Sequence, residues 1–134
     1  ACTAAARRLA EQLLEPLGSV EPIAAERLMD VVTAVSGSGP AYVFLLAEVL
    51  AAAAEQEGLD RDTAMRLASA TVAGAGALML ETGESAGALR KQVTSTGGTT
   101  EAALDVLASA DGLGPLLRRA VSAAAQRSRD LGKG

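Results

Sequence analysis

The chain has 134 residues, a net charge of −4, one cysteine and no histidine. The length is enough for a single domain, residues 1–134, with a core of its own. The absence of histidine excludes Ser-His-Asp and Cys-His nucleophilic catalysis and His-containing zinc sites. The acidic residues have no metal-binding spacing, so we predict no metal.

The charge pattern argues against nucleic acid and membrane as partners. Basic residues are scattered among acidic ones, without the basic stripe and interleaved aromatics of a nucleic-acid site. Glu48 and Glu55 interrupt the longest apolar run, which argues against a membrane span. The N-terminus lacks the layout of a signal peptide, and we therefore expect a cytoplasmic protein.

The residue pattern predicts an all-α fold, a bundle of about six to seven helices without strands. Ala and Leu dominate, and the only aromatic residues are Tyr42 and Phe44. Tyr42 is predicted to be a core or interface residue rather than an acid, because it is a lone ring among alanines. The predicted helices span residues 3–17, 24–35, 41–56, 60–80, 86–93, 99–110 and 115–131.

Three of these helices have distinctive faces. Glu26 and Asp30 lie four residues apart, a pair that by itself indicates only a solvated surface. The helix at 41–56 is apolar nearly all round, so this chain or a partner must bury it. Residues 73–77 alternate Ala and Gly, and such small side chains predict a close helix crossing.

Two glycine-containing loops are predicted between helices. Residues 36–40 read Ser-Gly-Ser-Gly-Pro, and we expect them to end one helix and open the next at Pro40, with Ser38 or Gly39 as cap. Residues 95–100 read Ser-Thr-Gly-Gly-Thr-Thr before another helix. Free N–H groups at a helix start, with hydroxyls beside them, suit a carboxylate or phosphate. The alternative is a plain cap and turn.

Together the two loops carry a family resemblance. Residues 30–44, Asp-Val-Val-Thr-Ala-Val-Ser-Gly-Ser-Gly-Pro-Ala-Tyr-Val-Phe, resemble the opening of the C-terminal domain of pyrroline-5-carboxylate reductase. Residues 89–104, which include the second loop, resemble the signature segment of that family. The order and spacing also match, and the similarity runs from about residue 9 to about residue 131.

The resemblance implies a fold, an activity and partners. Family members join an N-terminal Rossmann domain, which holds NADPH or NADH, to a helical domain that forms a homodimer through interleaved helices. Dimers often assemble further. They reduce 1-pyrroline-5-carboxylate to L-proline in proline biosynthesis. Because this chain matches only the helical domain and lacks the Rossmann domain, we expect the fragment alone to be inactive.

The resemblance also implies site residues. Thr100 and Glu26 are predicted as catalytic, since the Thr100 hydroxyl would reach the substrate ring nitrogen or carboxylate and Glu26 would favour a protonated imine. The predicted substrate site consists of Glu26, Thr33, Ser95, Gly97, Gly98, Thr99 and Thr100. The predicted cofactor contacts are Gln92, Ser36, Gly37, Ser38 and Gly39.

Several alternatives remain. Glu26 is also explained as a first-turn acid favoured by the helix dipole, and Thr33 as a packing residue. The family loop usually reads Ser-Pro-Gly-Gly, whereas this chain has Thr96, and Ala86 replaces a second common proline. These departures leave open a related imine reductase. A free-standing, non-catalytic dimerisation module is the other alternative.

Overall fold

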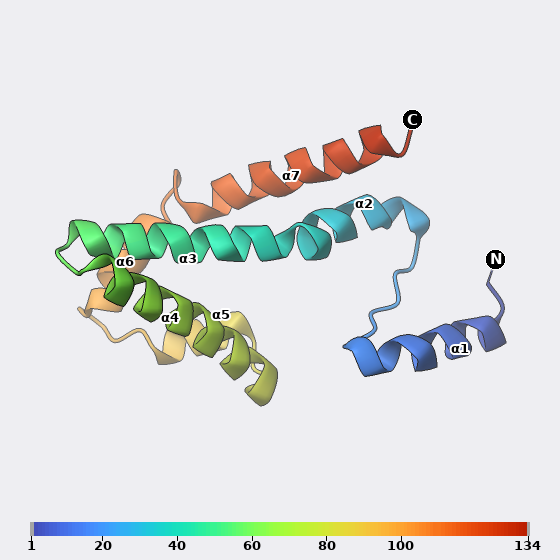
Figure 1. Cartoon of the computed structure of the whole chain (residues 1–134), viewed down its shortest axis with the longest axis horizontal. Coiled ribbons are helices and arrows are strands. Elements are labelled where there is room, and N and C mark those ends of the chain that lie inside the picture. The colour runs from blue at the N-terminus through green and yellow to red at the C-terminus, as the bar shows by residue number, and fades with distance from the viewer. Residues whose placement is uncertain (1, 134) are drawn as a thin grey trace.

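The structure, a computed structural model, describes residues 2–133. Every regular element in this range is helical, which confirms the all-α prediction (Figure 1). The elements are α1 (Ala4–Leu14), η1 (Glu15–Leu17), η2 (Glu26–Leu28), α2 (Met29–Val32), η3 (Thr33–Gly37), α3 (Gly39–Gln56), α4 (Arg61–Thr82), α5 (Ala86–Gln92), α6 (Thr99–Leu107) and α7 (Leu113–Leu131).

The helix starts follow from local capping chemistry. The predicted cap Asp60 opens α4, where its carboxylate accepts a hydrogen bond of 3.0 Å from the backbone N–H of Thr63. This bond lowers the pKa of the Asp60 carboxyl below its usual value. Ser85 caps α5 in the same way through the N–H of Ala88. Such side chains satisfy N–H groups that the helix itself leaves free.

The predicted loop at residues 36–40 is wrong, whereas the predicted helix start is confirmed, with Ser38 as the N-cap residue of α3 and Pro40 in its first turn. The structure places these residues in a nearly continuous helical stretch, in which η3 is a π-helical turn closed by a 2.8 Å bond from the Ser38 N–H to the Thr33 carbonyl. Only Ser38 separates η3 from α3, and its side chain makes no capping bond. Pro40 lacks an N–H and its ring would collide with the preceding turn of an α-helix. The wider π turn relieves that collision.

Tyr42 holds the π turn from the first turn of α3. Its hydroxyl donates a 3.1 Å hydrogen bond to the carbonyl of Ala34, a residue with no exposed surface. The ring itself is half-buried. Tyr42 is thus not part of the buried core of one chain, although the backbone satisfies its hydroxyl, and its role as a core or interface residue stays a prediction.

Helices α3 and α4 form an antiparallel hairpin, and α7 packs along α2 and η3 (Figure 1). Alanines fill the α3–α4 contact, namely Ala51, Ala64 and Ala68 with Ala54 beside them. Side chains this small let the two backbones approach closely. Gly58, with φ +102°, makes the turn between the helices in a conformation that other residues rarely adopt.

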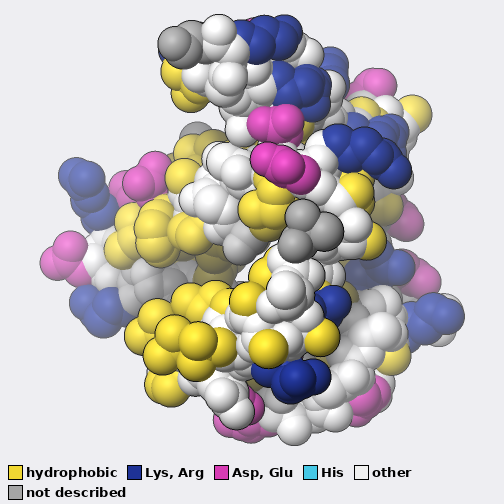
Figure 2. Space-filling view, turned by 90° about the vertical axis from the view of Figure 1, so that its right-hand side faces the viewer, with side chains coloured by type: hydrophobic (Ala, Val, Ile, Leu, Met, Phe, Trp, Pro, Cys, Tyr) yellow, Lys and Arg dark blue, Asp and Glu magenta, His cyan; other side chains and the backbone are white. Residues whose placement is uncertain are grey.

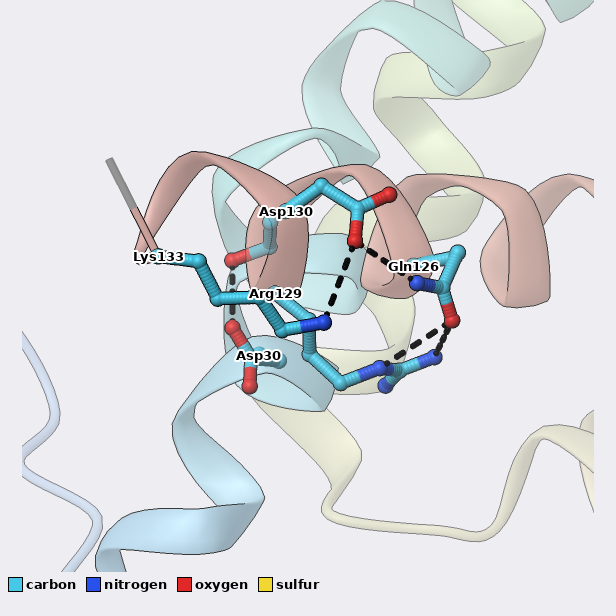
Figure 3. Close-up of polar contacts among 6 residues, drawn as sticks. Asp30, Gln126, Arg129, Asp130 and Lys133 are labelled. Carbon is cyan, nitrogen blue, oxygen red and sulfur yellow. Dashed lines mark hydrogen bonds and ion pairs between the residues drawn. The ribbon is translucent and has the colours of Figure 1, made fainter.

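A polar contact ties α7 to α2 across 98 residues of sequence. The Ser128 hydroxyl donates a 2.7 Å hydrogen bond to the Asp30 carboxylate. On the same stretch of α7, Gln126 bonds to Arg129 and to Asp130, as Figure 3 shows. Asp30 is thus half-buried and engaged, and the expectation of a merely solvated acidic face is wrong for this residue.

One chain buries very little apolar surface. The prediction that the chain forms a sizeable core of its own is therefore wrong. The only buried hydrophobic residues among those described are Ala34, Ala51, Ala64, Ala68, Leu89 and Ala125. The accessible surface is 10386 Å², whereas a compact monomer of 13.4 kDa exposes about 6,500 Å². Figure 2 accordingly shows hydrophobic side chains in open patches on the face in view.

A long uncovered apolar surface follows α3. Only Ala51 is buried among its 18 residues, while Phe44 is 67% exposed. The continuous stretch Glu26–Gln56 and helix α4 are each long and apolar enough to cross a membrane, judged by length and composition alone. Glu48 and Glu55 still interrupt the apolar run, and the absence of a membrane span stays a prediction. Helices that a partner protein covers pass the same test.

Helix α1 lies apart from the rest of the described chain (Figure 1). Thr3 caps it, and a 3-10 turn, η1, extends it to Leu17, close to the predicted end. An irregular segment, residues 18–25, connects it to η2. Its leucines are exposed, so the assignment of residues 1–134 to one domain stays a prediction.

Candidate functional site

The Ser95–Thr100 segment leads from α5 into α6 as predicted, with Gly98 as the N-cap residue of α6. The Gly98 N–H donates to the Ser95 carbonyl at 3.0 Å. Gly97 has φ +72°, a left-handed conformation that favours glycine. A Cβ on Gly98 would collide with the hydroxyl and carbonyl oxygens of Ser95. Both glycines are therefore required by the shape of this loop.

The start of α6 presents free hydrogen-bond donors. The backbone N–H groups of Thr99, Thr100 and Glu101 have no partner within residues 2–133, and no side chain caps the helix. They point out of the helix N-terminus, where the dipole favours negative charge. The Thr100 side chain is half-buried beside them. This arrangement can bind a small carboxylate.

We expect Gly98→Ala to lower the free energy of unfolding by about 1–3 kcal/mol, because the added methyl group has no room beside Ser95. Gly87→Ala is the matched control, since Gly87 lies inside α5 with nothing within 4 Å of an added Cβ. That control should be neutral or stabilising by up to about 1 kcal/mol. Chemical denaturation of both variants measures the difference. Equal effects at the two positions would contradict the described loop.

Gln92, a predicted cofactor contact, ends α5 just before this loop. Its amide nitrogen donates a 2.7 Å hydrogen bond to the carboxylate of Glu84, which fixes the direction of the amide. The other predicted cofactor contacts, residues 36–39, belong to the end of η3 and the start of α3. Ser36 and Gly37 are exposed, and Ser38 and Gly39 are half-buried.

Within one chain the predicted acid does not meet the predicted loop. Glu26 lies in η2 and Thr33 in η3, and both residues are exposed. Of these two elements η2 contacts α2, whereas η3 contacts α2, α3 and α7. The loop before α6 lies near the opposite end of the molecule (Figure 1). A hollow of about 660 Å³ between α1 and the segment after it includes Glu26 in its lining.

Two glutamates with clear polar contacts near the loop were missed by the sequence prediction. Glu101 accepts a hydrogen bond of 2.7 Å from the Gly97 N–H, and Glu84 binds Gln92. For Glu101 a signal was present, because an acid three residues after an N-cap typically bonds back toward the helix start. For Glu84 there was none, since its partner lies eight residues away across a helix boundary.

These features define an all-helical domain that has a donor-rich loop at the start of α6 and an apolar surface that one chain leaves uncovered. The family described as "Pyrroline-5-carboxylate reductase dimerisation" matches residues 26–131. The chain belongs to this family, as the resemblance predicted.

Relatives and solved structures agree with this assignment. Pyrroline-5-carboxylate reductase of Pseudomonas aeruginosa is 45% identical over 122 residues, covering 91% of this chain and 44% of the relative. The structure of a pyrroline-5-carboxylate reductase from Coxiella burnetii matches with a TM-score of 0.89 and 43% identity, over 97% of this chain and 48% of that one. The Plasmodium falciparum pyrroline carboxylate reductase with NADP bound matches with a TM-score of 0.80 and 28% identity, over 98% of this chain and 49% of that one.

The chain spans less than half the length of these relatives. Residues 1–25 lie outside the dimerisation match, although the alignment with the Pseudomonas aeruginosa enzyme covers 91% of the chain and so extends into them.

Proposed function

We propose that this chain is the C-terminal domain of a pyrroline-5-carboxylate reductase, which reduces 1-pyrroline-5-carboxylate to L-proline with NADPH or NADH. The observation that carries the proposal is the set of free N–H groups at the start of α6, in the loop that resembles the signature segment of this family. The domain would supply the substrate carboxylate site and the dimer interface. We infer a cytoplasmic protein, as expected from the sequence.

The substrate carboxylate would bind at the N-terminus of α6. The N–H groups of Thr99 and Thr100, which have no partner within the described residues, would face it. The Thr100 hydroxyl would donate to the carboxylate or contact the ring nitrogen. Ser95, Gly97 and Gly98 would shape the loop so that these donors converge. Bound this way, the imine carbon is held at a fixed position for reduction.

Glu26 and Thr33 would reach this site only from a second subunit. They lie far from the loop in their own chain, Glu26 in η2 beside α2 and Thr33 in η3 beside α7. A carboxylate near the imine nitrogen favours its protonated form, and protonation makes the carbon a better hydride acceptor. A site that includes both groups would therefore be complete only in the dimer.

The cofactor would be held mainly by a nucleotide-binding domain outside this chain. When bound, its nicotinamide supplies the hydride. Gln92 suits a contact with it, because Glu84 occupies the amide nitrogen of Gln92 and leaves the amide oxygen free to accept. Ser36, Gly37, Ser38 and Gly39 would lie against the same region.

The dimer would form through the uncovered faces of α3 and α4. Gly74 and Gly76 of α4 have nothing within 4 Å of an added Cβ, so a helix of a second subunit can approach there closely. The accessible surface of 10386 Å² is larger than that of a compact monomer. Because the chain belongs to a dimerisation family, this excess favours a protein partner over a membrane. Further association of dimers is part of the proposal.

The test is oxidation of NADPH or NADH by the protein joined to its nucleotide-binding domain, with pyrroline-5-carboxylate as substrate. We expect substrate-dependent turnover and L-proline as product. A folded, dimeric full-length protein without turnover would contradict the reductase and favour the non-catalytic module. Preference for another cyclic imine would instead favour the related imine reductase that Thr96 and Ala86 leave open.

A further inference from the structure

Glu101 closes the loop that precedes α6. It is the third residue of the helix, and its side chain turns back so that Oε2 accepts the N–H of Gly97 at 2.7 Å. Glu101 is half-buried, and Gly97 is the left-handed residue of the loop. The bond therefore fixes the one residue whose conformation directs the chain into the helix.

The contact extends a known capping arrangement by one residue. In a capping box, an acid at the third helical position accepts the N–H of the N-cap residue. Here the N-cap residue is Gly98, whose N–H is already donated to Ser95, and the acid reaches Gly97 instead. Both glycine N–H groups are thus used inside the loop, whereas those of Thr99 and Thr100 remain free.

We propose that Glu101 is a positioning residue for the substrate carboxylate, an inference that rests on the proposed function. It holds the loop so that Thr99 and Thr100 donate to the substrate. Gly97 supplies the left-handed backbone conformation of the loop, and its N–H donates to Glu101 and not to the substrate. A negative charge beside an anion site weakens anion binding through Coulomb repulsion. The gain in substrate affinity from the loop geometry that Glu101 imposes must therefore exceed the loss from this repulsion. Removing the side chain should therefore weaken substrate binding, although it removes repulsion.

The experiment compares Glu101→Ala and Glu101→Gln in the full-length protein, with Glu21→Ala as control. Glu21 lies exposed in the segment between η1 and η2 and has no assigned role. We expect Glu101→Ala to raise KM for pyrroline-5-carboxylate about tenfold, or about 1.4 kcal/mol. KM for the nicotinamide cofactor should change little. Glu101→Gln keeps an acceptor oxygen, and we expect it to recover most of the loss.

The outcomes are distinct. A lower KM in both variants would show that Glu101 only competes with the substrate, which would overturn the inference. An unchanged KM in Glu101→Ala, with wild-type turnover intact, would overturn it and leave the proposed function standing. Wild-type protein that is folded, binds the cofactor and has no turnover would contradict the proposed function and this inference with it. Faster amide hydrogen exchange at residues 96–99 in Glu101→Ala alone would support the closed loop.

Discussion

Phe44→Glu is expected to leave the chain monomeric and largely unfolded at micromolar concentration. Phe44 is 67% exposed on α3, the helix whose apolar surface has no cover in one chain. Burying a phenylalanine contributes about 1.5–3 kcal/mol, and each dimer contains two copies. A buried carboxylate in its place adds a desolvation cost. Since about 1.4 kcal/mol is a factor of ten, the dissociation constant should rise at least a hundredfold.

Sedimentation equilibrium and circular dichroism measure this effect on mass and helicity together. Gln12→Glu is the matched control, because it adds the same charge to α1, which makes no major contact with α3 or α4. The control should keep the dimeric mass of the wild type. If the wild-type chain is itself a folded monomer at micromolar concentration, the proposed dimer is wrong.

Thr100→Ala should lower kcat/KM for pyrroline-5-carboxylate by about 10- to 100-fold in the full-length protein. Thr100 is the second residue of α6, in the turn whose N–H groups are free, and a hydrogen bond to a charged group contributes about 1.5–3 kcal/mol. The backbone N–H of residue 100 is retained in the variant. Steady-state kinetics with varied substrate and saturating cofactor would measure the loss.

Thr96→Ala is the control for this variant, since it removes a hydroxyl from the same loop at a position without an assigned role. It should change kcat/KM by less than about twofold. Equal losses in the two variants would indicate a general loop defect. Unaltered kinetics in Thr100→Ala would argue against the proposed substrate site.

Much of the helical architecture could be predicted because helix ends are decided locally. Asp60 is a typical cap, and Gly58 and Gly83 end helices in conformations that glycine adopts easily. The run at 36–40 was mistaken for a loop because its serines and glycines suit either a loop or a helix start. The deciding factor was the collision that Pro40 would cause in a regular α-helix.

The candidate site could be predicted only in part. The loop at 95–100 is contiguous, so its residue types and spacing determine the glycine geometry and the donors at α6. Glu26 and Thr33 are remote in sequence, and no local pattern reports their distance from that loop. The small size of the core could not be predicted from the sequence either. Apolar periodicity shows which face of a helix is buried, but not whether the same chain or a partner buries it.

The π turn at residues 33–37 also has a rotational effect. An α-helix turns about 100° per residue, and the wider turn of η3 takes up one residue more than an α turn would. Helix α2 faces α7 before this turn, and α3 faces α4 after it. Helices α2 and α3 follow one another in a nearly continuous stretch, with α7 and α4 on different sides of it (Figure 1). The extra residue thus sets the angle, about the helix axis, between the face of α2 that contacts α7 and the face of α3 that contacts α4. A regular α-helix through the same residues would rotate one face against the other by about 100°, with the composition of both unchanged.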